Sequence, residues 1–212
     1  MNKILLYFSL LSFLFCLNAD AQNMDFKDGL DAYKSGDYKK SISIMDSVIK
    51  DTPDFFTAYY ILGLSQHRSK MYMEAIDTLK KASELRPKNG KVLTNLSRVY
   101  IDSGSNELAL SSALEGAKLS PDTSAFNVVG RAYLVNKNYD NAIKAFKQAI
   151  DIDQLNAWAL NNLGYTYILM NDFDNAFEPL KNAVKIDPKN ALFKKNFDFA
   201  NAQINKSATP EE

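Results

Sequence analysis

The fold is decided by one stretch, residues 157–190, which read AWALNNLGYTYILMNDFDNAFEPLKNAVKIDPKN. Its apolar residues recur at spacings of three and four, which predicts two amphipathic helices. A polar turn near Asn171 separates them, and Pro188 near the end cannot continue a helix. Small residues at Gly164 and Ala176 let the two helices approach closely. The stretch therefore predicts a helix–turn–helix unit.

This unit recurs along the chain. The small residue of the second helix returns at intervals of 34, 34, 33 and 34 residues, at Ser41, Ala75, Ala109, Ala142 and Ala176. Twelve residues earlier in each copy stand Gly29, Gly63, Ser97, Gly130 and Gly164. Four of the five copies end near a Pro. Self-similarity at a fixed period predicts an array in which neighbouring units bury each other's apolar faces.

The residues at these positions resemble the tetratricopeptide repeat (TPR) family. The last copy carries Leu160, Leu163-Gly164, Tyr167, Ala176, Leu180, Ala183 and Pro188, and the second and fourth copies carry similar sets. The resemblance covers residues 22–190. It implies an all-α fold, a right-handed α-solenoid of five TPR helix–turn–helix repeats at 22–55, 56–89, 90–122, 123–156 and 157–190.

Beyond the fifth repeat, the sequence predicts a C-terminal capping helix at 191–206 and a disordered tail at 207–212. The cap places one apolar stripe on a helix face, formed by Phe193, Phe197, Ala200 and Ile204.

Departures from the pattern predict local differences in stability. Repeat three has Gly116 in its second helix, so we expect that helix to be the least stable. Pro179 is expected to bend the second helix of repeat five slightly. Asp25 and Asp28 replace large apolar residues in repeat one, which is tolerable because no repeat precedes it.

Residues 1–21 predict an export signal. Lys3 precedes an apolar run from Ile4 to Leu17, and Ala19 and Ala21 suit a cleavage site after residue 21. The run is shorter than a membrane span, for which about 20 apolar residues are needed. Lipid anchoring at Cys16 is disfavoured by the bulky Phe15 before it. We therefore expect an exported chain, periplasmic or secreted, without stable membrane insertion after cleavage.

Composition excludes several kinds of function. The 25 basic and 25 acidic side chains balance, which gives no cationic field for nucleic acid. One Cys and one His cannot build a structural zinc site or an intrachain disulfide. A nucleophile with a histidine base would have to use His67, and no phosphate loop or other strong catalytic motif is present. The sequence predicts a chain that is not an enzyme and has no cofactor or metal.

The resemblance also implies a binding groove. In the family, exposed residues on the first helix of each repeat line a concave surface. Carried over position by position, the candidate groove residues are Tyr60, Leu64, His67, Lys91, Arg98, Asn127, Arg131, Asn161 and Tyr165. The dicarboxylate clamp of chaperone-binding members is absent from this set.

Two features of this groove predict its chemistry. Arg98 and Arg131 share one position in adjacent repeats and would clamp a carboxylate together, unless they are solvated or ion-paired within their repeats. Asn127 and Asn161 are expected to pair with the backbone of an extended peptide. The leading interpretation is a module that binds a protein or peptide in the cell envelope. The alternative is a structural or self-associating scaffold, and the oligomeric state stays open.

Overall fold

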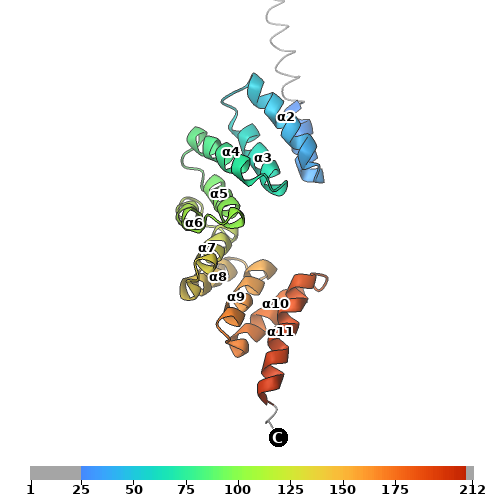
Figure 1. Ribbon diagram of the computed structural model, residues 1–212, viewed down its shortest axis with the longest axis vertical. Coiled ribbons are helices and arrows are strands. Elements are labelled where there is room, and N and C mark those ends of the chain that lie inside the picture. Colours follow the sequence, from blue (N-terminus) through green and yellow to red (C-terminus); the bar gives the residue numbers. More distant parts are fainter. Residues whose placement is uncertain (1–24, 209–212) are drawn as a thin grey trace, which may run out of the picture. The chain divides into compact units, whose positions relative to one another are not determined.

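A computed structural model of the chain describes residues 25–208, and the side chains through residue 206 (Figure 1). Within that range the protein is entirely helical, which confirms the predicted all-α repeat fold. The first helix covers residues 25–35. It is followed by α2 (Tyr38–Asp51), α3 (Phe56–Arg68), α4 (Tyr72–Leu85), α5 (Gly90–Ser103), α6 (Asn106–Leu119), α7 (Thr123–Val135), α8 (Tyr139–Ile152), α9 (Ala157–Leu169), α10 (Phe173–Ile186) and α11 (Ala191–Ala208).

The helices form two compact units, which divide after Pro87. The described part of the first unit holds the helix at 25–35 and α2 to α4. Its core is a cluster of buried side chains from α2 and α3, namely Met45, Val48, Ala58, Ile61 and Leu62. The exposed Asp25 and Asp28 lie on its first helix, in keeping with a polar N-terminal face.

The second unit, described from Lys88 to Ala208, is a row of helix pairs. Each helix from α5 to α11 packs on the next. The odd-numbered helices, which are the first helices of their repeats, also pack on one another from α5 through α7 and α9 to α11. Side chains such as Phe146, Leu180 and Phe193 are fully buried between these layers. This arrangement brings the candidate groove residues of α5, α7 and α9 onto neighbouring helices.

The turn inside each repeat uses one backbone conformation. Gly36, Lys70, Gly104, Lys137 and Asn171 all have positive φ angles, between 58° and 84°. Each residue ends the first helix of its repeat at the turn positions that the sequence period marks. Polar side chains then begin several of the following helices, since Asp37, Asn138 and Asp172 each accept a hydrogen bond from the backbone N–H three residues later.

Small residues allow close contact between the two helices of a repeat. A Cβ atom at Gly63 would lie 2.7 Å from Leu79 Cγ, and one at Gly130 would overlap the Phe146 ring. Where Ser97 replaces the glycine, its hydroxyl donates to the Ala109 carbonyl across α5 and α6 at 2.7 Å. The serine variant of the pattern therefore keeps the helices close and adds a hydrogen bond.

Gly116 has a packing role in α6. A Cβ there would lie 2.9 Å from the Thr94 backbone nitrogen, and one at Gly90 would lie 2.5 Å from the Gly116 carbonyl oxygen. The two glycines thus mark a backbone-to-backbone crossing of α5 and α6. The low stability expected of α6 stays a prediction.

The C-terminal helix ends slightly later than the sequence predicts. α11 runs to Ala208, so Ser207 and Ala208 are helical rather than part of the tail assigned to 207–212. One face of α11 carries an exposed ion pair, with Lys194 Nζ 3.2 Å from Asp198 Oδ2. Pro179 lies inside α10, which continues through it as one helix.

The predicted signal at 1–21 lies outside the described residues. Among the helices that are described, none combines the length and apolar character needed to cross a membrane.

Candidate functional site

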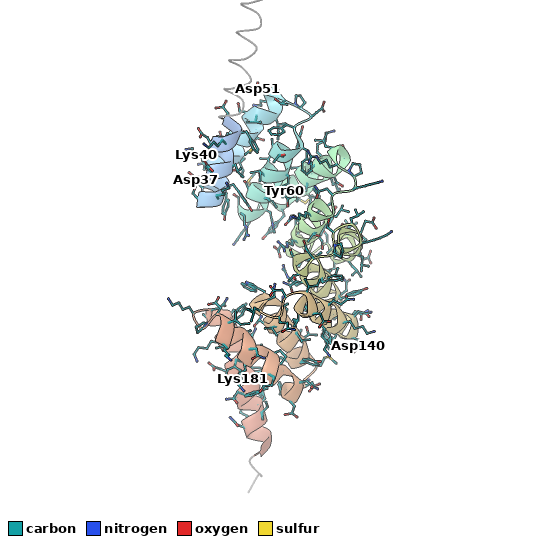
Figure 2. All side chains as sticks on the ribbon, turned by 180° about the vertical axis from the view of Figure 1, so that it is seen from behind. Asp37, Lys40, Asp51, Tyr60, Asp140 and Lys181 are labelled. Carbon is teal, nitrogen blue, oxygen red and sulfur yellow. The ribbon has the colours of Figure 1, made fainter. Side chains whose placement is uncertain are left out.

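In the first unit, the candidate groove residues Tyr60, Leu64 and His67 lie along α3, where Figure 2 labels Tyr60. Tyr60 and Leu64 are partly buried and pack against the core of this unit. The Tyr60 ring stacks on Phe56, with ring centroids 5.9 Å apart and planes 10° apart. The His67 ring lies 6.1 Å from that of Tyr72, at the start of α4. These contacts give the α3 surface a mainly aromatic character.

In the second unit, the two arginines link neighbouring first helices. Arg98 Nη2 on α5 donates to Ser124 Oγ on α7 at 2.7 Å. Arg131 Nη2 on α7 lies 3.2 Å from Asp102 Oδ1 on α5, with both side chains about one third exposed. Arg131 is therefore ion-paired, as in the alternative kept open from the sequence, but with a carboxylate of the preceding repeat. Both arginines thus make polar contacts to the neighbouring first helix, Arg98 to Ser124 and Arg131 to Asp102. A shared carboxylate clamp stays a prediction.

The two candidate asparagines are held by a second pair of asparagines. Asn162 Nδ2 donates to Asn127 Oδ1 at 2.9 Å, and Asn196 Nδ2 donates to Asn161 Oδ1 at 2.9 Å. Each bond joins one first helix to the next, from α9 to α7 and from α11 to α9. Asn161 is only 2% exposed, whereas Asn127 is partly buried. The bonds fix the orientation of both acceptor amides.

Sequence reasoning missed the donors Asn162 and Asn196. The signal was present, because the two donors are 34 residues apart, as are the two acceptors. The candidate groove positions carried over from the family include Asn161 on α9, and each donor stands one residue away from such a position.

Two aromatic side chains are exposed on α9. Trp158 is 53% exposed and Tyr165 is 38% exposed. Trp158 is supported from α11, since its ring meets that of Phe193 edge-on with centroids 4.9 Å apart. The candidate Lys91, at the start of α5, is also exposed. The second unit thus presents cations on α5 and α7, amides on α7 and α9, and aromatic rings on α9.

Several other features of the described residues lie away from the candidate groove. Two shallow hollows lie away from the groove positions, and Figure 2 labels residues at both: Asp37 and Lys40 at the start of α2, and Asp140 at the start of α8. Burial raises the pKa of the Asp46 carboxyl, an effect that Lys50 opposes, but Asp46 lies on the second helix of its repeat. Within the described residues, no three His, Cys, Asp or Glu side chains are placed to hold a metal ion.

Comparisons with known proteins agree with the repeat architecture. Family models described as TPR repeat and tetratricopeptide repeat match residues 26–90, 130–171 and 157–190, which together make up more than half of the chain. One relative is DnaJ homolog subfamily C member 3 of Gallus gallus, 27% identical over 124 residues. That match covers 55% of this chain and 24% of the relative, so the chain spans about a quarter of the relative's length.

Two solved structures share the fold over most of the chain. YrrB, described as a TPR protein with an unusual peptide-binding site, is 24% identical with a TM-score of 0.63, covering 81% of this chain and 89% of YrrB. TTC0263 of Thermus thermophilus, described as a thermophilic TPR protein, is 20% identical with a TM-score of 0.71, covering 84% of this chain and 98% of TTC0263. The recurring motif, the packed helix pairs and the family matches lead to one conclusion: the chain belongs to the tetratricopeptide repeat family.

Proposed function

We propose that this protein is a non-enzymatic interaction module that binds an extended segment of a partner protein along the first helices of its repeats. The observation that carries the proposal is the repeated amide pair. Asn162 and Asn196 hold the Oδ1 atoms of Asn127 and Asn161. Asn161 is buried, so the amide that this leaves with its NH2 group oriented for a ligand is that of the partly exposed Asn127. An extended peptide offers one carbonyl per residue to such donors.

The row of helices supplies the second argument. Groove residues on α7 and α9 are presented by packed helices rather than by loops, so little conformational entropy is lost when a ligand binds. The relative YrrB, described as having a peptide-binding site, supports the same kind of ligand for this chain.

The proposed place of action is the cell envelope or the outside of the cell. This part of the proposal depends on the export signal expected at residues 1–21, with Lys3, the apolar run and the Ala19–Ala21 cleavage motif. The partner is then a protein or peptide that is itself exported.

The test is selection of displayed random 12-residue peptides on the full chain, followed by affinity measurement of the selected peptides on variants. We expect Asn127→Ala to weaken binding about tenfold, a loss typical of a buried peptide hydrogen bond. Replacing both groove arginines, Arg98→Glu with Arg131→Glu, is expected to weaken binding of acidic peptides without lowering helix content.

The matched control is Asn182→Ala, which removes an exposed asparagine from the second helix α10. Its binding should equal that of the unchanged chain. Failure to select any peptide, or selected peptides that bind Asn127→Ala and the double arginine variant at full strength, would remove the proposal.

A further inference from the structure

The C-terminal helix α11 packs as the first helix of a sixth repeat. The hydrogen bond from Asn196 to Asn161 repeats the one from Asn162 to Asn127, with the same 35-residue separation. The burial pattern repeats too: Ala159 and Thr166 on α9 are fully buried, and so are the residues 34 positions later, Phe193 and Ala200. α11 also contacts α9 directly, as α9 contacts α7.

This register places three side chains of α11 in line with groove residues of α9. Leu192, Lys195 and Phe199 stand 34 positions after Trp158, Asn161 and Tyr165. Leu192 is 46% exposed and Phe199 is 47% exposed. Phe199 is held by an edge contact with Phe173 at the start of α10, with ring centroids 6.1 Å apart.

The exposed aromatic and aliphatic side chains on α9 and α11 therefore form one surface. We call it the apolar platform, and its residues are Trp158, Tyr165, Leu192 and Phe199. Exposed aromatic groups on a firm support are the usual anchors of peptide recognition.

The charged side chains at the aligned groove positions are all positive. The groove positions of α5, α7, α9 and α11 carry four cations, at Lys91, Arg98, Arg131 and Lys195, and no carboxylate. Asp102, at a neighbouring position of α5, offsets one of them through its ion pair with Arg131. Although the chain as a whole is neutral, these four cations and one carboxylate give the surface a local positive excess, which suits an acidic ligand.

We propose that α11 lines the groove as well as capping the stack, and that the second unit binds an extended acidic peptide whose large apolar side chains rest on the apolar platform. This inference rests on the proposed peptide-binding function and adds the chemistry of the ligand. Lys195 stands three residues after Leu192 and four before Phe199, so two turns of α11 offer an ammonium group between two apolar contacts.

The test uses four pools of fluorescent 12-residue peptides of random order with the full chain, measured by fluorescence anisotropy. The pools combine acidic residues with Phe and Leu, basic residues with Phe and Leu, acidic residues with Ser and Gly, and neutral residues with Phe and Leu. We expect the acidic apolar pool to bind about tenfold or more tightly than each of the others, and its binding to weaken as salt rises.

Variants of α11 then locate the site. Phe199→Ser and Lys195→Glu should each weaken binding of the acidic apolar pool about fivefold or more. The controls are Leu155→Ser, at a highly exposed residue of the α8–α9 turn, and Lys194→Glu, at the neighbouring lysine of α11, which is paired with Asp198 instead of standing at a groove position. Both controls should stay within about twofold, and circular dichroism should show unchanged helix content in all four variants.

The outcomes separate this inference from the proposed function. If Tyr165→Ser or Asn127→Ala weakens peptide binding while both α11 variants do not, the chain binds peptides but α11 does not take part. If the four pools bind equally, the charge and apolar preference is wrong. If neither the pools nor displayed random peptides bind, the peptide-binding function fails as well.

Discussion

Two glycines of the chain illustrate different reasons for a missing side chain. Gly104 ends α5 with a φ of 81°, and a Cβ there would meet no other atom within 4 Å. Gly130 lies inside α7, where a Cβ would overlap the ring of Phe146. The first position needs a left-handed backbone, and the second needs an empty volume.

These reasons give different costs for the same substitution. Gly104→Ala should lower the free energy of unfolding by about 1 kcal/mol, because of backbone strain alone. Gly130→Ala should lower it by about 2 kcal/mol or more, because Phe146 is fully buried and cannot move away cheaply. Urea unfolding followed by circular dichroism measures both values. Equal costs would contradict this assignment.

The ion pair between Arg131 and Asp102 predicts a functional effect at the residue scale. Asp102→Asn removes the carboxylate that competes with an acidic ligand for Arg131. We expect acidic peptides to bind more tightly to this variant, by about two- to fivefold, while stability changes by less than about 1 kcal/mol because the pair is partly exposed. Titration with the acidic apolar pool measures the change, and weaker binding would show that Asp102 instead positions Arg131.

Among the elements, α6 combines a helix-interior glycine with close backbone packing. Leu108 and Leu114 of α6 are also exposed, so less of its apolar surface contributes to the core. We expect the backbone amides of α6 to exchange with deuterium faster than those of α8 and α10, the second helices of the next repeats. Hydrogen-exchange mass spectrometry tests this order, which would be wrong if α6 were protected as well as α8.

Although α6 is expected to be weak, replacing its glycine should not strengthen it. Gly116→Ala improves intrinsic helix propensity by about 1 kcal/mol. The added Cβ would, however, approach the Thr94 backbone nitrogen to 2.9 Å, so we expect a net loss of stability. A higher melting temperature for this variant would mean that α5 and α6 separate easily.

The elements also show what the sequence could and could not predict. The helix pairs follow from Gly, Ala and Leu spacings because contacts within a repeat have a short, constant separation. The turn at Lys137 was predictable for the same reason. The bond from Arg131 to Asp102 was not, because it depends on which of several side-chain conformations reaches the neighbouring helix. The packing of α11 beside α9 as a further first helix was not predicted, because Asp198 stands where four of the five repeats have a glycine.

For the whole molecule, both ends of the described chain are polar. The first helix exposes Asp25 and Asp28, and α11 exposes the Lys194–Asp198 pair on one face. A polar end face gives little gain from stacking against another copy. We expect sedimentation at increasing concentration to show a monomer. A mass that rises with concentration would favour the scaffold alternative.

Export of the chain, with cleavage of its first residues, is a second prediction for the whole molecule. If residues 1–21 direct export, the mature protein begins at Gln22 and contains no cysteine, because Cys16 is removed. Mass spectrometry of the protein purified from the cell envelope or the medium should show the chain shortened by those residues. A full-length mass, or a lipid attached at Cys16, would contradict it.

The paired asparagines join the helices of the stack, whereas other positions on the same helices would contact the ligand. Asn127 with Asn162, and Asn161 with Asn196, form hydrogen bonds that join successive first helices. Meanwhile one groove position changes from Lys91 to Ser124, Trp158 and Leu192 along the row. Evolution can therefore alter what each helix recognises by single substitutions without disturbing its neighbours. Proteins of this architecture can diverge in partner choice while their scaffolds stay superimposable.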